Sequence, residues 1–163
     1  MTTCDKNTVD NTVDAITDAL LTASRLLVAI SARSIADVDE SITIPQFRSL
    51  VILSSRGSMN LATLAGLLGV QPSTTGRMVD RLVTAGLIDR QPHPNSRREL
   101  LVELSTPGHE LVRKVMARRR KEIARVVQNM PALERQGMVR ALTAFTTSGH
   151  EPAAQIEIDD QTF

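Results

Sequence analysis

The chain of 163 residues has no tryptophan and no tyrosine, and its only aromatic side chains are Phe47, Phe145 and Phe163. A pocket that holds an aromatic ligand by ring stacking needs such side chains. We therefore do not expect a pocket of this kind. A pocket lined by leucine, valine and methionine is compatible with the composition.

Cysteine and histidine are scarce. Cys4 is the only cysteine, which excludes an internal disulfide, and no Cys/His cluster has the spacing of a zinc site. His93, His109 and His150 have no acid or nucleophile at a recognisable catalytic spacing, and no glycine-rich loop could cradle a phosphate. We therefore expect no enzyme activity, no cofactor and no metal site.

No continuous apolar run approaches the roughly 18 residues that a transmembrane helix needs. The first residues, MTTCDKNTVDNTVD, are polar and acidic, unlike the basic and then apolar start of a signal peptide. These features predict a cytoplasmic protein with no membrane partner.

The formal net charge of +1 conceals local segments of strong and opposite charge. Residues 71–98 carry five arginines against two aspartates, a local charge of +3, and residues 111–125 carry seven basic residues against one glutamate, a local charge of +6. Residues 149–163 carry four acids and no lysine or arginine. Since attraction depends on where charge lies, the small net charge does not argue against nucleic-acid binding.

The segment from Pro72 to Gly86 predicts an amphipathic helix of about four turns, because proline suits a first turn and glycine a helix end. At about 100° per residue its two faces separate. Thr75, Met78, Val79, Leu82 and Val83 form the inward face, and Ser73, Thr74, Arg77, Asp80, Arg81 and Thr84 form the outward face. Arg77, near the N-terminal end, is our first choice for reading a base in the major groove. The alternative is that these are ordinary solvated charges.

The segments on either side of this helix favour a role in nucleic-acid binding over ordinary solvated charges. Leu61 to Leu68 predict a short helix that ends at Gly69, with Val70 filling the turn and small Ala65 and Gly69 letting the two helices approach closely. After Gly86 we expect a strand, a turn over residues 92–96 and a returning strand over residues 100–104. Arg97 and Arg98, at the tip of this hairpin, can reach a minor groove or its phosphates.

These motifs resemble the MarR family of winged helix-turn-helix regulators. QFRSLVIL is similar to that family's second helix, Leu61 to Gly69 to its third, and GRMVDRLVTAGLIDRQ to its recognition helix and first wing strand. PHPNSRRELLVELSTPGHEL is similar to its wing and the start of its long fifth helix. The family commonly has Asp-x-Arg in the wing. Here the arginine is matched by Arg98, and Ser96 replaces the carboxylate.

The resemblance implies a mainly α fold with a small β-hairpin wing: a winged helix-turn-helix with six helices that dimerises. We expect an N-terminal dimerisation helix in residues 1–40, a DNA-binding lobe in 41–104, C-terminal dimerisation helices in 105–148 and an acidic tail in 149–163. Apolar stripes support the dimer, because the terminal helices have more apolar surface than one chain can cover. One stripe is Val13, Ile16, Ala19, Leu20, Ala23, Leu27 and Ile30, and a second runs from Leu111 to Met130. Leu133, Met138, Leu142 and Phe145 give a third, in a sixth helix.

The expected function is therefore sequence-specific binding of double-stranded DNA by a homodimeric transcriptional regulator, a repressor on a pseudo-palindromic operator, with release by a small-molecule effector as in many relatives. The expected DNA contacts are Ser73, Thr74, Arg77, Arg81, Arg97 and Arg98. The alternative is a winged helix that binds another protein, without specific DNA binding. For the basic tract of residues 118–121, a solvated face, a second contact to the DNA backbone and a landing site for the acidic tail all stay open.

Overall fold

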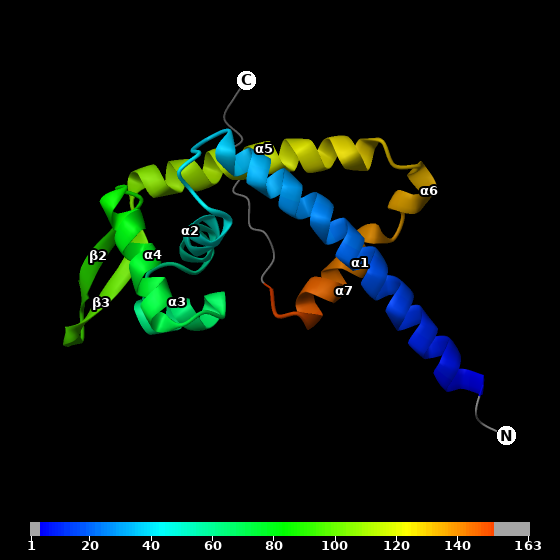
Figure 1. Cartoon of the computed structure of the whole chain (residues 1–163), viewed down its shortest axis with the longest axis horizontal. Coiled ribbons are helices and arrows are strands. Elements are labelled where there is room, and N and C mark those ends of the chain that lie inside the picture. Colours follow the sequence, from blue (N-terminus) through cyan, green and yellow to red (C-terminus); the bar gives the residue numbers. More distant parts are fainter. Residues whose placement is uncertain (1–3, 152–163) are drawn as a thin grey trace. The chain divides into compact units, whose positions relative to one another are not determined.

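The computed structural model describes residues 4–151, with side chains from Asn11 onwards except those of Arg97 and Arg98. Figure 1 shows the elements in this part of the chain: α1 (Cys4–Ala36), α2 (Ile44–Arg56), β1 (Met59–Asn60), α3 (Leu61–Leu68), α4 (Pro72–Thr84), β2 (Ile88–His93), β3 (Ser96–Leu104), α5 (Thr106–Gln128), α6 (Ala132–Arg135) and α7 (Met138–Ser148). The chain forms two compact units that divide between Ile123 and Ala124. The predicted architecture, mainly helical with a small β wing, is confirmed.

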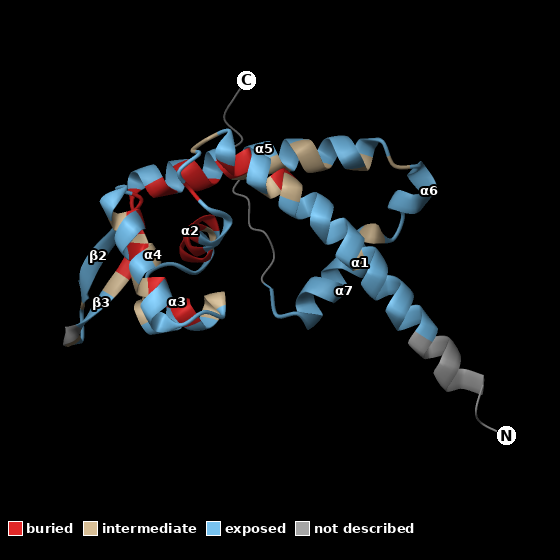
Figure 2. Cartoon of the chain, viewed as in Figure 1, coloured by how far each residue is buried: buried red, intermediate tan, exposed pale blue. Residues whose placement is uncertain are grey.

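The first unit has its core where α2, α3 and α4 meet the sheet. Leu50 and Leu64 are fully buried, as are Val79 and Leu82 of α4. Figure 2 shows buried segments along α2 and on one side of α4. The start of α2 is fixed by a capping box, because Thr43 accepts a hydrogen bond from the Gln46 N–H and the Gln46 side chain accepts one from the Thr43 N–H.

The sheet has three antiparallel strands in the order β1-β3-β2. The hairpin of β2 and β3 was predicted, but its turn is shorter than expected, because β2 extends to His93 and β3 begins at Ser96. Only Pro94 and Asn95 remain between them. The edge strand β1, which pairs Met59 with Val102, was not predicted. Two residues are too few to show an alternating pattern.

The helices α3 and α4 have the predicted boundaries. The glycines that follow them allow the backbone conformation in which each helix ends. Gly69 has φ +68° and Gly86 has φ +73°, where glycine avoids the strain of a side chain. The close approach expected at Gly69 is wrong, since a Cβ built there meets nothing within 4 Å. Val70 does not fill the turn either, because 41% of it is exposed.

The end of α4 is joined to the start of α5 by a junction of hydrogen bonds. The Ser105 hydroxyl donates to the Gly86 carbonyl at 2.6 Å and accepts from the Gly108 N–H at 3.1 Å. The Ser105 N–H donates to the Leu87 carbonyl at 3.2 Å. A Cβ at Gly108 would lie 2.2 Å from that carbonyl oxygen, so only glycine allows α5 to come this close. The first half of α5, which we expected to serve dimerisation, also buries Leu111 and Val115 in the core.

Most of α1 lies outside that core. Ile30 and Ile35 near its end are buried, but Val13 and Ile16 are 57% and 54% exposed, and Figure 2 shows α1 exposed along most of its length. Among the described helices, the 26-residue segment Asn11–Ala36 is long and apolar enough to span a membrane by length and composition, because an 18-residue window within it has a mean hydropathy of 1.5. Asp14, Asp18 and Arg25 interrupt this segment, so it is not a continuous apolar run.

The second unit contains the predicted sixth helix as two shorter helices, α6 and α7. The break falls at Gln136 and Gly137, where Gly137 has φ +76°. Apolar side chains on both helices are exposed within one chain, including Leu133 at 80% and Phe145 at 55%.

We predict that Gly108→Ala destabilises the fold by about 1–3 kcal/mol, because the added methyl group would collide with backbone rather than with a flexible side chain. Gly66→Ala is the matched control. Gly66 lies in α3 with nothing within 4 Å of a built Cβ, so alanine there should leave stability unchanged or raise it by up to about 1 kcal/mol. Urea unfolding of both variants measures the difference, and equal midpoints would contradict the close approach.

Candidate nucleic-acid interface

The outward face of α4 is the candidate interface. Ser73, Thr74, Arg77 and Arg81 are all exposed, whereas Thr75, Val79 and Leu82 are buried, as the sequence predicted. The helix begins at Pro72 with Gln71 as its N-cap, and no side chain caps it, so the residues of its first turn are free to meet a ligand. The apolar face holds the helix on its lobe while the polar face stays open.

A hollow of about 210 Å³ opens beside this face, between α4 and the start of α2. It is lined by Thr43, Gln46, Thr74, Arg77, Met78 and Arg81. The two helices are held together next to it by Ser49, which is fully buried and whose hydroxyl lies 3.6 Å from the Met78 sulfur. The structure therefore brings together two of the predicted arginines, Arg77 and Arg81, with Thr74.

The contribution of α2 to this surface was not predicted from the sequence. Gln46 lines the hollow although it is only 8% exposed, and its neighbour there is Thr43. The signal was present as Thr43-x-x-Gln46 before an apolar run, the pattern of a capping box. That pattern places a helix start. It does not indicate that the helix start faces the outward side of α4.

The one acidic residue on the outward face of α4 is paired. Asp80 makes an ion pair with Arg90 of β2, and both side chains are partly exposed. The pair neutralises the carboxylate where it would oppose an anionic ligand. Among the described residues, the side chains of Arg77 and Arg81 make no hydrogen bond or ion pair, so their charge remains available.

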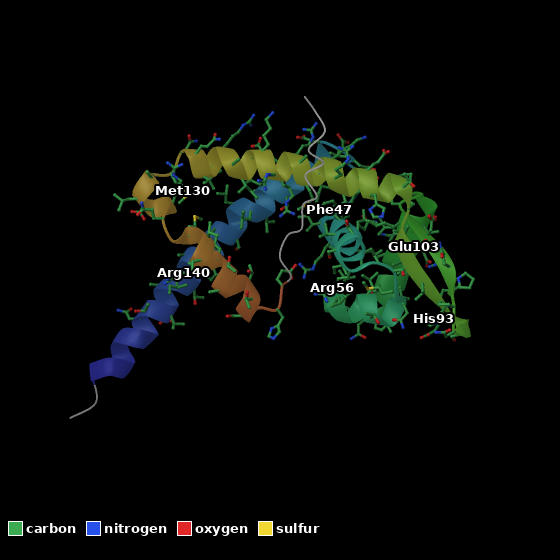
Figure 3. All side chains as sticks on the ribbon, turned by 180° about the vertical axis from the view of Figure 1, so that it is seen from behind. Phe47, Arg56, His93, Glu103, Met130 and Arg140 are labelled. Carbon is green, nitrogen blue, oxygen red and sulfur yellow. The ribbon has the colours of Figure 1, made fainter. Side chains whose placement is uncertain are left out.

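The wing is ordered by its own side chains. The Asn95 N–H donates to His93 Nδ1 at 3.1 Å across the turn, and Gln91 bonds to Glu103 on the adjacent strand. Figure 3 shows His93 near the tip of the hairpin and Glu103 farther from it. The backbone of Arg97 and Arg98 lies in β3 directly after the turn, and their side chains fall outside the described part of the chain.

The basic tract of α5 divides into different environments. Arg118 pairs with Asp37 at 3.1 Å, and Arg120 and Lys121 are exposed. Arg119 is partly buried, its Nε has no hydrogen-bond partner, and burial lowers the pKa of its guanidinium. This arrangement agrees with a mostly solvated face. Of the expected acidic tail, residues 152–163 lie outside the described residues, and Glu151 is exposed.

Comparison with known proteins identifies the lobe. Residues 42–100 match the family model described as MarR family. The solved structure of RV1404 from Mycobacterium tuberculosis is 71% identical, covers 88% of this chain and 97% of its own, and superposes with a TM-score of 0.83. The chain belongs to the MarR family.

The curated relatives of this MarR-family chain are transcriptional regulators. An uncharacterized HTH-type transcriptional regulator of Mycobacterium leprae is 36% identical over 81 residues, which are 50% of this chain and 56% of that protein. The multiple antibiotic resistance protein MarR of Escherichia coli is 37% identical over 67 residues, 41% of this chain and 46% of that protein. The matches thus span about half the length of these relatives.

One neighbour in fold is a DNA complex. The F27L mutant of MepR from S. aureus, solved bound to an oligodeoxyribonucleotide, covers 82% of this chain and 96% of its own with a TM-score of 0.61. The two sequences are 19% identical, so this likeness concerns the fold alone.

We predict that the Asp80–Arg90 pair contributes less than about 1 kcal/mol to stability, since exposed ion pairs are screened by solvent. A double-mutant cycle with Asp80→Ala and Arg90→Ala, followed by urea unfolding, measures the coupling. A coupling this small would mean that the outward face of α4 is not needed for the stability of the fold. A coupling well above 1 kcal/mol would instead mean that the pair helps to hold α4 on the wing.

Proposed function

We propose that this MarR-family chain is a homodimeric repressor that binds a pseudo-palindromic operator in double-stranded DNA and is released by a small-molecule effector. The carrying observation is the outward face of α4, where two arginines without intramolecular partners stand on a helix that the core fixes in place. MepR supports the proposal, because a protein of the same fold has been solved with DNA.

The roles of the side chains follow from their positions. Ser73, Thr74 and Arg77 lie in the N-terminal half of α4, the end that enters a major groove, and Arg77 can contact guanine through two hydrogen bonds. Arg81, one turn further, and Arg97 and Arg98 after the wing turn contact phosphates or a narrow minor groove. Backbone contacts set affinity, whereas base contacts set sequence preference.

The homodimer is proposed from exposed apolar surface. In the first unit α1 leaves Val13, Ile16 and Leu27 largely uncovered, and in the second unit Leu133 and Phe145 are exposed. Several large apolar side chains exposed on one helix of a small protein mark an interaction site. A second copy related by a two-fold axis covers these faces and presents two recognition helices about one DNA turn apart.

We predict that Arg77→Ala weakens operator binding by about 1–3 kcal/mol and relaxes preference at one operator position, because a base contact is lost. Arg97→Ala or Arg98→Ala should weaken binding to all sequences alike. Each should lower the slope of log affinity against log salt by about 2 in the dimer, at roughly 0.9 for each phosphate contact. Titrations at several salt concentrations on the operator and on a scrambled duplex measure both effects.

Operator fragments for these titrations come from selection of genomic DNA bound by the chain. Equal losses for Arg77→Ala on both duplexes would refute its role in base reading. A binding activity that does not weaken with salt would favour the other class of function, a winged helix that recognises a protein through apolar contacts.

We predict that the chain is a dimer at micromolar concentration and that Ile16→Asp shifts it toward monomer, because the new carboxylate would be buried against the partner. Thr22→Asp places the same charge at an exposed position about a third of a turn away from the apolar stripe of α1 and should leave the dimer intact. Light scattering of the three proteins measures this. A stable wild-type monomer, or co-sedimentation of the chain with membranes through α1, would contradict the proposed dimer.

A further inference from the structure

Met78 places a thioether sulfur in the wall between α2 and α4, next to the arginines of the recognition helix. The residue is half-buried, and it lines the same hollow as Arg77 and Arg81. Among the six residues of that lining, it is the one whose side chain a peroxide readily oxidises. The proposed function gives this sulfur no role.

Among the described residues, the Met78 sulfur has no strong hydrogen-bond donor. Its polar neighbour is the Ser49 hydroxyl at 3.6 Å, and the same hydroxyl lies 3.1 Å from the Pro45 carbonyl oxygen. A hydroxyl has one proton to donate, and a thioether is a weak acceptor, so the proton goes to the carbonyl. The lone pairs of the sulfur are therefore available for reaction.

Met59 and Met116, the other described methionines of the first unit, are less suited to oxidation. Met59 is buried in the core, with 9% of its surface exposed. The Met116 sulfur lies 3.5 Å from Nη1 of Arg119, and the positive charge of that donor holds the lone pair. Met78 instead borders a hollow of about 210 Å³. A water molecule takes up roughly 30 Å³ of liquid, so a molecule as small as hydrogen peroxide can enter.

We propose that Met78 is an oxidation site at which hydrogen peroxide converts the thioether to a sulfoxide, and that the sulfoxide weakens DNA binding. The lone pair of the sulfur forms an S–O bond as the O–O bond of the peroxide breaks. The sulfur loses two electrons, and the peroxide is reduced. The transferred oxygen gives its proton to the departing hydroxide, which leaves as water.

The new oxygen has room only in the hollow, because the interior beside the fully buried Ser49 is close-packed. The lining of the hollow includes no acid, and the side chains of Arg77 and Arg81 have no partner in the described part of the chain. A sulfoxide oxygen accepts hydrogen bonds, so we expect it to bind a guanidinium group and to withdraw that arginine from DNA. This consequence rests on the proposed function, whereas the reaction at the sulfur does not.

Treatment of the Cys4→Ser variant with hydrogen peroxide tests the site without interference from the only cysteine. Affinity for the operator should fall by at least about tenfold as Met78 is oxidised, because a charged hydrogen-bond donor is lost to the DNA. Methionine sulfoxide reductases should restore it. Mass spectrometry of proteolytic peptides measures the oxidation of each methionine, and titration of the operator measures affinity.

Substitutions in the Cys4→Ser background separate Met78 from the other methionines. Met78→Leu nearly conserves volume and should keep its affinity after peroxide treatment. Met116→Leu is the matched control, because it removes another half-buried methionine and should lose affinity like the Cys4→Ser chain. Met78→Gln places an amide oxygen near the position of the sulfoxide oxygen and should bind the operator weakly without oxidant.

Two results would overturn the proposal: an equal loss of affinity in oxidised Met78→Leu, or a Met78 that stays reduced while Met116 is oxidised. If urea unfolding shows that Met78→Leu is not folded, protection by DNA decides instead. Operator DNA on α4 should slow the oxidation of Met78 but not that of Met116, and unchanged rates for both refute the site.

The rate of oxidation without DNA distinguishes failure of this site from failure of the proposed function. A chain that binds no DNA refutes the proposed function. Faster oxidation of Met78 than of Met59 and Met116 then supports the oxidation site by itself, and slower or equal oxidation refutes it.

Discussion

The recognition helix depends on the junction where its last turn meets the start of α5. A helix ends with carbonyl groups that lack partners, and the turn after α4 adds those of Gly86 and Leu87. Ser105 satisfies both through its hydroxyl and its N–H, and Gly108 lets α5 approach that backbone. Since Ser105 is only 7% exposed, water does not compete strongly for these bonds. The direction of α4 is therefore fixed by α5 and the core together.

Because α5 and the core hold α4 in place, its outward face can carry arginines that have no partner within the described part of the chain. Val79 and Leu82 are fully buried on its opposite side, so the position of the helix does not depend on what Arg77 and Arg81 contact. Their charges need no partner in the folded chain because they stay in water, where an exposed cation costs little. Asp80, the one carboxylate on that face, already has Arg90 as its counter-ion. The fold thus holds this cationic surface in place without help from any contact of Arg77 or Arg81.

The sequence was sufficient where local chemistry decides the structure. The 3.6-residue period separated the faces of α4 correctly, and Gly69 and Gly86 marked helix ends that require positive φ. It was insufficient where distant segments meet. The strand β1 forms because its backbone pairs with that of β3. Gln46 lies beside α4 because of the way in which α2 packs in the folded unit. Similarly, apolar periodicity predicted α5 but could not assign its first half to the core of the same chain.

The end of α1 is joined to the rest of the first unit by contacts of different strength. The Arg118–Asp37 pair joins α5 to the segment after α1, but both side chains are more than half exposed, and such pairs contribute little. Ile35, in contrast, belongs to the same packed cluster as Val79 and Leu82 of α4. Close-packed interiors are nearly incompressible and transmit displacement. The packed contact through Ile35 is therefore a firmer link between the end of α1 and α4 than the surface ion pair.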